Sequence, residues 1–253
     1  MTAGHLGGGH LLVARDSPLH RLGAAAKVVG AIALAGAVVA VPRGTWVPLA
    51  AAAAVVAGMV WLARLPVRTV AARTALEAPF IGFALLMPLF GSGPQVEVLG
   101  VALYRSGIEA GATLLTKATL GVVVAVVLAA TTPTDEVLGA LRRLRVPAAL
   151  VAIMGQLVRY GEVLVTEAKR MHVARLARAE DPRWLWQARG FASGLGMLFI
   201  RSVERGERVQ RAMVARGFTG SIPRPPPTAV PAGHTALALV PAAIVIVTMA
   251  AVW

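Results

Sequence analysis

Long apolar runs separated by short polar breaks dominate the pattern of this chain. A helix needs about 20 mainly apolar residues to cross the hydrocarbon core of a bilayer. Five runs reach or approach that length, at residues 24–41, 46–63, 78–90, 108–130 and 235–253. The third run is short and contains Pro88, so we expect it to be tilted, kinked or partly re-entrant unless it includes the preceding turn. The pattern predicts an all-α polytopic integral membrane protein with about five transmembrane helices.

Charged residues interrupt this pattern between the fourth and fifth runs. Thr134, followed by Asp135 and Glu136, is typical of a helix start. Further along, small and apolar residues recur at steps of three and four, which predicts a long amphipathic helix that packs one face against another helix. That face consists of Leu195, Leu198, Phe199, Ser202, Gly206, Val209 and Met213. Such helices suit a docking platform for a cytosolic partner, but a basic surface held at anionic lipid headgroups fits the pattern equally well.

These patterns divide the chain into three regions. We expect residues 1–130 to form an N-terminal membrane region with about four transmembrane helices. Residues 131–224 would form a cytoplasmic region of amphipathic helices, and residues 225–253 a proline-rich linker and a C-terminal transmembrane helix. Lys and Arg gather in segments that lie on one side of the predicted spans. Because positively charged loops stay in the cytoplasm, we expect a multi-pass protein of the plasma membrane with its N-terminus and residues 131–224 inside.

Composition supports a membrane protein. The chain is 57% apolar and 15% charged, whereas soluble domains average about 45–50% apolar and about 25% charged. Its 253 residues include no cysteine, which excludes disulfides and thiolate metal sites. The net charge of +13 would suggest a nucleic-acid partner in a soluble protein. Here we expect the lipid bilayer as a partner and no nucleic acid.

Motifs for catalysis or nucleotide binding are missing from the sequence. It contains neither a G-x-x-x-x-G-K-[ST] phosphate loop nor an H-E-x-x-H or G-x-S-x-G motif. The histidines lack the compact spacing of a metal site; they are His5, His10, His20, His172 and His234. We therefore expect a non-catalytic protein that binds no metal and no cofactor itself.

Three charged residues fall within or near predicted spans. Lys27 lies near an end of the first span, where its side chain is expected to reach the interface. Glu109 and Lys117 belong to the fourth span and lie about 12 Å apart along a helix axis, so a direct pair is not expected. The role of Glu109 and Lys117 stays open.

Several segments resemble, in order, the transmembrane T component of energy-coupling factor (ECF) transporters, particularly the CbiQ type of cobalt and nickel uptake systems. The N-terminal match is Ser17-Pro-Leu-His-Arg-Leu22 with Ala26-Lys27. The segment after the fourth span matches in Thr134-Asp-Glu-Val-Leu-Gly-Ala-Leu141 and Val146-Pro147. The most specific match is Leu198-Phe-Ile-Arg-Ser-Val-Glu-Arg205, leading to Ala212-Met-Val-Ala-Arg-Gly-Phe-Thr-Gly220. Together these segments cover most of the chain.

The resemblance implies two Ala-Arg-Gly signatures at the ends of coupling helices, whose arginines insert into grooves of two ATPase subunits. Ala215, Arg216 and Gly217 match the second signature completely. For the first, the match by context is Ala177, Arg178 and Ala179, in which Ala replaces the final Gly. A literal copy at 188–190 leaves Arg189 open as the alternative arginine. Without the resemblance, arginines at helix C-termini also suit the helix dipole.

The resemblance also implies a function and a set of partners. The chain would be the energy-coupling subunit of an ECF-type ABC importer, passing ATPase movement to a membrane-embedded substrate-binding subunit of CbiM type for cobalt or nickel uptake. Its partners would be two ATP-binding cassette ATPase subunits, which use the ATP, and that CbiM-type subunit, with a small accessory membrane subunit left open. The alternative is a basic membrane anchor or scaffold that binds anionic lipid or nucleic acid and has no transport role.

Overall fold

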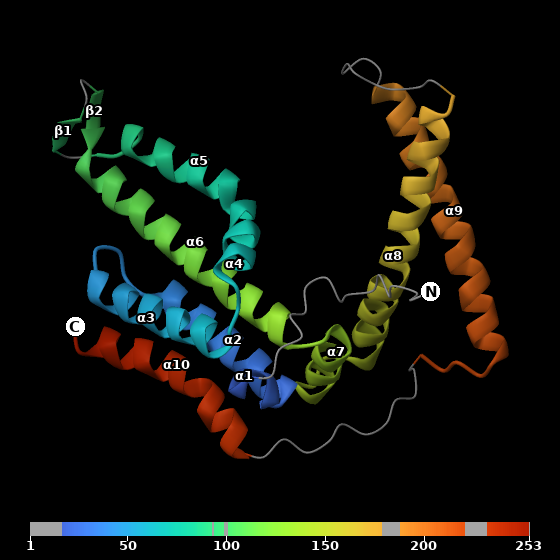
Figure 1. The fold of residues 1–253 in the computed structure, drawn as a ribbon, viewed down its shortest axis with the longest axis horizontal. Coiled ribbons are helices and arrows are strands. Elements are labelled where there is room, and N and C mark those ends of the chain that lie inside the picture. Colours follow the sequence, from blue (N-terminus) through green and yellow to red (C-terminus); the bar gives the residue numbers. More distant parts are fainter. Residues whose placement is uncertain (1–16, 93, 99–100, 179–187, 221–231, 253) are drawn as a thin grey trace. The chain divides into compact units, whose positions relative to one another are not determined.

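The computed structural model describes residues 17–92, 94–98, 101–178, 188–220 and 232–252. They fall into two units: residues 17–143 with 232–252, which we call the bundle, and the described part of residues 144–220, which we call the arm. Figure 1 shows that nearly all of the described chain is helical. The prediction of an all-α polytopic membrane protein is confirmed, and one two-stranded hairpin, missed in the sequence, joins the helices of the bundle.

The core of the bundle lies between α2 (Ala24–Ala40), α3 (Trp46–Leu62), α6 (Arg105–Thr131) and α10 (Ala232–Ala250). Helix α2 packs against α6, α10 and the short α7 (Thr134–Arg143), while α3 packs against α6 and α10. Aliphatic side chains from all four long helices form one buried cluster, which includes Leu34, Val38, Leu49, Val56, Leu120, Val124 and Val245. The short α1 (Pro18–Arg21) precedes α2.

Helices α2 and α10 approach so closely that only glycine fits at position 30. A Cβ atom added to Gly30 would overlap the backbone carbonyl oxygen of Ala238. Small residues let helix backbones come together in membranes, where packing replaces the hydrophobic effect as the driving force. Movement of α2 therefore cannot occur without a response from α10.

We expect Gly30→Ala to destabilise the bundle by about 1–3 kcal/mol, because α2 and α10 must separate to admit the methyl group. The matched control is Gly36→Ala on the same helix, since a Cβ at position 36 has open space around it. There the better helix propensity of Ala should leave stability unchanged or raise it by up to about 1 kcal/mol. Thermal unfolding of the purified protein in detergent compares the two variants. Equal unfolding temperatures would contradict the close approach.

The third predicted span is a bent pair of helices. Helix α4 (Val67–Thr74) and α5 (Ala78–Leu86) are separated by the 3-10 turn Ala75–Glu77, and the two parts of the pair are bent by 60°. A second 3-10 turn, Met87–Leu89, contains Pro88. The 60° bend, however, lies before Ala78 and not at Pro88, where the sequence led us to expect a kink. On α6, Gly107 and Gly111 lie one turn apart and contact the backbone of this segment without intervening side chains. The pair is therefore held on α6 by close packing.

A β-hairpin connects the bent pair to α6. Strands β1 (Gln95–Val98) and β2 (Val101–Tyr104) are antiparallel, with Gln95 opposite Tyr104. Next to it, the Ser106 hydroxyl donates to the Ser92 carbonyl at 2.6 Å, and the Ser92 amide donates back to that hydroxyl at 3.2 Å. These bonds tie the start of α6 to the end of the preceding segment.

Length and composition allow α6, α8 (Ala148–Leu176) and α10 to cross a membrane, and the bent pair is a fourth candidate within the described residues. Helices α2 and α3 have 17 residues each, or about 25 Å at 1.5 Å per residue, a little less than the hydrocarbon core. All five predicted runs are thus helical. Helix α8 qualifies because its first part is apolar, while its charged residues begin at Arg159.

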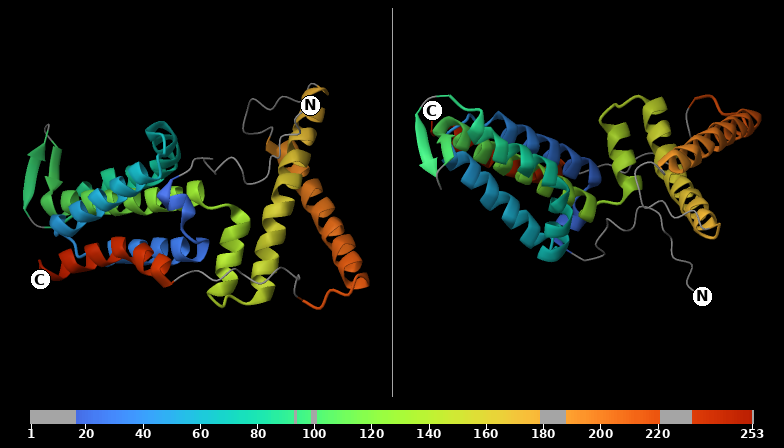
Figure 2. Two further views of the ribbon diagram at one scale, coloured as in Figure 1. Left: turned by 60° about the horizontal axis from the view of Figure 1, so that its bottom comes forward. Right: turned by 90° about the horizontal axis from the view of Figure 1, so that it is seen from above.

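The arm consists of α8 and α9 (Ala188–Ala215), which form an antiparallel pair. Arg201 of α9 makes an ion pair of 2.7 Å with Glu167 of α8, and nearer the other end the Gln156 amide contacts the Met213 sulfur at 3.6 Å. Figure 2 shows the pair from two further sides. The predicted packing face of α9 is turned toward α8, and Met213 contacts Gln156 there. Close packing is not seen at Ser202, Gly206 and Val209, which line an open groove beside α8, and a Cβ at Gly206 would have no neighbour within 4 Å. Phe199 of the predicted face is 70% exposed.

Candidate coupling site

The second Ala-Arg-Gly segment forms the C-terminal cap of α9. The amide of Gly217 donates to the Val214 carbonyl at 2.9 Å, and the amide of Phe218 donates to the Met213 carbonyl at 3.0 Å. This is the Schellman arrangement, in which the residue after the cap takes a left-handed conformation that favours glycine. Gly217 has φ of +81°, as the arrangement requires. The glycine therefore stops the helix and fixes the backbone beside Arg216.

Arg216 is exposed at this cap. Within the described part of the chain no carboxylate pairs with it, although other arginines of the same helix pair with Glu204 and Glu207 one turn away. A guanidinium group offers a planar fork of donors that suits a carboxylate. The end of α9 thus presents the Arg216 guanidinium, which has no ion pair within the described residues, on a backbone fixed by the helix cap.

The end of α8 carries the first candidate segment. The Ala177 amide donates to the Val173 carbonyl and the Arg178 amide to the Arg175 carbonyl, both at 3.0 Å. Arg178 is exposed, as Arg216 is, and has no ion pair within the described residues. Ala179 lies outside the described residues. Arg178 therefore shares with Arg216 a place directly after the last turn of an arm helix.

Arg189 lies elsewhere in the arm. Residues 188–190 form the first turn of α9, and their side chains are outside the description. A helix N-terminus bears partial positive charge and lacks the C-terminal cap geometry seen at Arg216. The position of Arg178 thus corresponds to that of Arg216 more closely than the position of Arg189 does.

An apolar groove of about 630 Å³ runs between α8 and α9. From α8 it is lined by residues that include Ile153, Leu157 and Leu164, and from α9 by Val209 and Met213. Phe218 lines it too, and both Met213 and Phe218 form the hydrogen-bonded cap that holds Arg216. A molecule in the groove would therefore touch the same residues that fix the backbone at Arg216.

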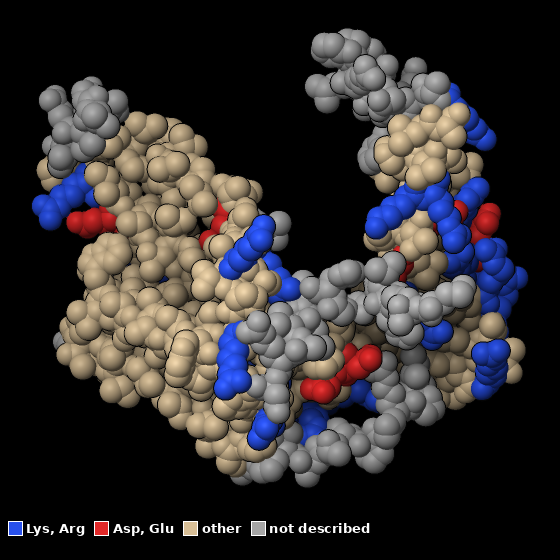
Figure 3. All heavy atoms as spheres, viewed as in Figure 1, with Lys and Arg blue, Asp and Glu red and all other residues tan. Residues whose placement is uncertain are grey.

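The arm also exposes large apolar side chains. Leu157 is 68% exposed, and Val173 and Val214 are exposed to 62% and 59%. Leu157 and Val214 both line the groove, whereas Val173 does not. Exposed apolar side chains that gather in one place usually mark a contact with a partner or a membrane. Figure 3 shows Lys and Arg gathered on the arm among neutral surface. The arm thus combines an apolar groove with a strongly basic exterior.

Buried polar groups in the bundle differ from the prediction in one respect. The Lys27 ammonium does not extend to the interface, because it donates to the carbonyl oxygens of Thr131 at 2.8 Å and His20 at 3.3 Å and is only 8% exposed. At the other end of the same helix pair, Lys117 donates to the carbonyls of Val39, at 2.9 Å, and Val41. Helices α2 and α6 are thus antiparallel and each supplies a lysine that caps the C-terminal end of the other.

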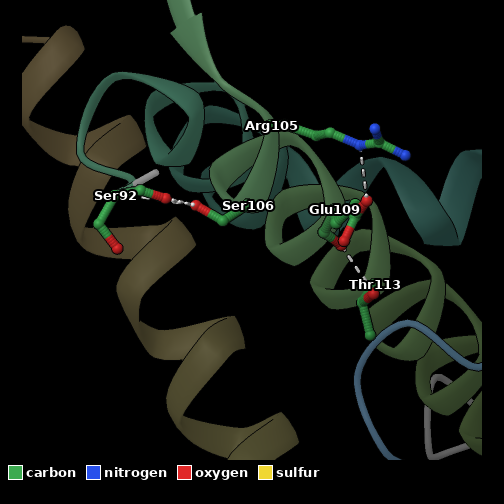
Figure 4. Close-up of polar contacts among 5 residues, drawn as sticks. All are labelled: Ser92, Arg105, Ser106, Glu109 and Thr113. Atoms are coloured by element: carbon green, nitrogen blue, oxygen red, sulfur yellow. Dashed lines mark hydrogen bonds and ion pairs between the residues drawn. The ribbon is translucent and has the colours of Figure 1, made fainter. Parts of the chain in front are cut away.

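The two carboxylates of this part of the bundle have separate partners. Glu109 pairs with Arg105 at 3.3 Å and its backbone carbonyl accepts the Thr113 hydroxyl, as Figure 4 shows, so it does not pair with Lys117. Glu77 is 2% exposed at the break in the bent pair, and its carboxylate lies 3.0 Å from the Thr119 hydroxyl. Sequence reasoning missed Glu77, although an acid at the edge of an apolar run is itself a signal.

Metal-binding groups do not gather in the part of the chain that the structure describes, since no three His, Cys, Asp or Glu side chains come together there. His5 and His10 lie outside the described residues. The Ser17 hydroxyl and His20 Nδ1 are 2.7 Å apart, which links the short helix α1 to the residue that caps it. The arrangement suits a structural role for this histidine.

The fold is that of a polytopic α-helical membrane protein with an arm of two amphipathic helices. The chain belongs to the CbiQ family of cobalt transport proteins, whose sequence profile matches residues 15–227.

Two relatives illustrate the similarity. The chain is 32% identical over 163 residues to the cobalt transport protein CbiQ of Rhodobacter capsulatus, a match that covers 63% of this chain and 64% of that protein. It is 26% identical over 231 residues to a putative fused cobalt transport protein CbiMQ of Methanocorpusculum labreanum, covering 85% of this chain and 38% of the relative. The matches thus span less than two thirds of either relative.

Proposed function

We propose that this chain is the energy-coupling transmembrane subunit of an ECF-type ABC importer for cobalt or nickel. The observation that carries this proposal is the pair Arg178 and Arg216, each exposed directly after the last turn of an arm helix and each without an ion pair in the described chain. Two such cations on two rigid helices suit two copies of an ATPase subunit. The two ATPase subunits bind and hydrolyse the ATP, and this chain is not an enzyme.

The two arginines would transmit movement of the ATPase subunits to the arm. Each guanidinium would engage a carboxylate in a groove of one ATPase subunit, and closure of the two subunits around ATP would move the ends of α8 and α9 together or apart. Charge-assisted, bidentate bonds hold geometry as well as adding energy. The short side chains of Ala177 and Ala215 let each helix end enter a groove. In this arrangement the N-terminus and the arm lie in the cytoplasm.

The apolar groove of the arm would receive a helix of the membrane-embedded substrate-binding subunit. We infer a CbiM-type subunit because the relative from Methanocorpusculum is named as a fusion of CbiM and CbiQ, and the match to this chain covers 38% of it. Residues of the groove also form the cap of Arg216. Movement of the ATPase subunits would therefore reach the substrate-binding subunit through the arm itself.

Co-expression of this chain with the ATPase and CbiM-type subunits from the same genome tests the proposal. We expect one stable complex on affinity purification and ATP-dependent uptake of Co²⁺ into vesicles, with Ni²⁺ as the competing cargo. The rival function, a basic anchor for phosphate groups, predicts retention on anionic lipid or nucleic acid that falls steeply with salt. Salt-sensitive retention without ATPase binding and without uptake would refute the proposal.

A further inference from the structure

The point where α6 leaves the bundle is held by one side chain. A helix end leaves its last carbonyl groups without partners, and a buried carbonyl without a partner is costly in a membrane. Lys27 of α2 supplies the missing donor to Thr131, the last residue of α6, and Thr131 is itself 2% exposed. The same ammonium bonds to His20 of α1. Lys27 thus joins α1, α2 and the end of α6.

Helix α7 begins directly after this junction. It starts at Thr134 and packs on α2, and its residues Leu138 and Ala140 are buried. Glu136 in its first turn interacts electrostatically with Lys27. Along the chain α7 leads into α8, so it is the covalent connection between α6 and the arm. A displacement of α7 would therefore act on Lys27 in two ways, through the charge of Glu136 and through the end of α6.

Lys117 provides a comparison within the same pair of helices. It makes the same kind of bond, from an ammonium to C-terminal carbonyls, at the opposite end of α2 and α6. The chain there turns through Pro42 into α3 and does not lead to the arm. The two lysines therefore have the same capping chemistry, but only one of them adjoins α7.

We propose that Lys27 is a positioning residue that transmits movement of α7 to the membrane helices. The ammonium has three donors and can keep its carbonyl partners through a small rotation, so α2 follows α7 and the end of α6. Because α2 meets α10 backbone to backbone at Gly30 and Ala238, α10 moves with it. This inference rests on the proposed function, since it needs an arm that is moved by ATPase subunits.

The test compares Lys27→Met with Lys117→Met in the complete complex reconstituted in vesicles. Methionine keeps an unbranched side chain of similar length and removes the charge. For each variant, assembly, ATP hydrolysis and Co²⁺ uptake are measured, and the decisive quantity is the uptake per ATP hydrolysed. We expect Lys27→Met to lower this ratio at least about fivefold, the lower end of typical coupling between sites. Lys117→Met should leave the ratio unchanged even where it lowers the thermal stability.

Two further variants keep the inference falsifiable if Lys27→Met assembles poorly. Lys27→Arg keeps the charge and should retain most of the ratio. Glu136→Gln changes an exposed residue and should lower the ratio in the same direction, with an effect that is not additive with that of Lys27→Met because the two residues interact.

An unchanged ratio in Lys27→Met, or in Glu136→Gln where Lys27→Met does not assemble, would overturn the inference. So would an equal fall in Lys27→Met and Lys117→Met, because both lysines would then be caps alone. In either case the wild-type complex still takes up Co²⁺ and the proposed function stands. Absence of ATP-driven uptake by the wild-type complex would instead overturn the proposed function and this inference together.

Discussion

Arg216→Glu should abolish ATP-driven cobalt uptake while leaving the arm folded. The substitution places a carboxylate where the proposed ATPase groove offers one, so attraction becomes repulsion. Truncating one partner of a buried, hydrogen-bonded charge pair costs about 2–5 kcal/mol at protein interfaces, and reversing the charge costs more. We therefore expect the affinity for the ATPase subunit to fall by at least about 30-fold. Pull-down of the ATPase subunits and uptake into vesicles measure the two effects.

The structure indicates that this change leaves the fold intact. Arg216 is exposed, and within the described chain it makes no ion pair that the substitution would break. The cap depends on backbone bonds and on the φ of Gly217, which the new side chain does not alter. Far-UV circular dichroism of the purified protein should match the wild type.

A control on the same helix separates position from charge. Arg211 is exposed, and its contact with Glu207 is a surface pair of 4.0 Å that contributes little to stability. Arg211→Glu changes the net charge by the same amount as Arg216→Glu but lies more than one turn before the cap. It should retain assembly and uptake. Equal losses in the two variants would show that the overall charge of the arm matters, which is the property of a basic anchor.

The same experiment identifies the arginine of the first signature. Arg178 follows the last turn of α8, whereas Arg189 is in the first turn of α9. We expect Arg178→Glu to weaken ATPase binding as Arg216→Glu does, and Arg189→Glu to have a small effect. The reverse result would assign the first signature to the copy at 188–190.

Elements that depend on local pattern could be predicted from the sequence. The five apolar runs are helices, and the small and apolar face of α9 is turned toward α8, which it contacts at Met213. The helix stop at Gly217 follows from the special freedom of glycine in left-handed backbone. In each case the cause lies within a few residues along the chain, so the pattern contains it.

Features that depend on distant partners could not be predicted. Lys27 and Thr131 are 104 residues apart. A lysine near a helix end can either extend its ammonium to the membrane interface or cap a neighbouring helix, and its position in the sequence does not distinguish the two. The break at Glu77 depends on Thr119, 42 residues away on α6. The groove of the arm exists only because α8 and α9 pair in one register. Sequence periodicity gives a face for each helix but no partner for that face.

Leu157→Glu should separate the substrate-binding subunit from the complex. Leu157 lines the groove of the arm and is 68% exposed, so the substitution costs the isolated chain little. When an apolar helix fills the groove, however, the new carboxylate must lose its water without gaining a partner. Burying such a charge costs several kcal/mol, so we expect the CbiM-type subunit to be lost on purification while both ATPase subunits remain bound.

The matched control for the groove is Val173→Glu on the same helix. Val173 is 62% exposed but does not line the groove, so the same charge on a similarly exposed apolar residue of α8 should leave the complex whole. Subunit composition on gel filtration distinguishes the variants. Loss of the CbiM-type subunit from both variants would mean that the apolar surface of α8 as a whole binds it. Retention in both variants would show that the groove is not its binding site. Loss in Leu157→Glu alone, with ATP hydrolysis continuing, would place the contact beside the cap of Arg216, where movement of the ATPase subunits enters the arm.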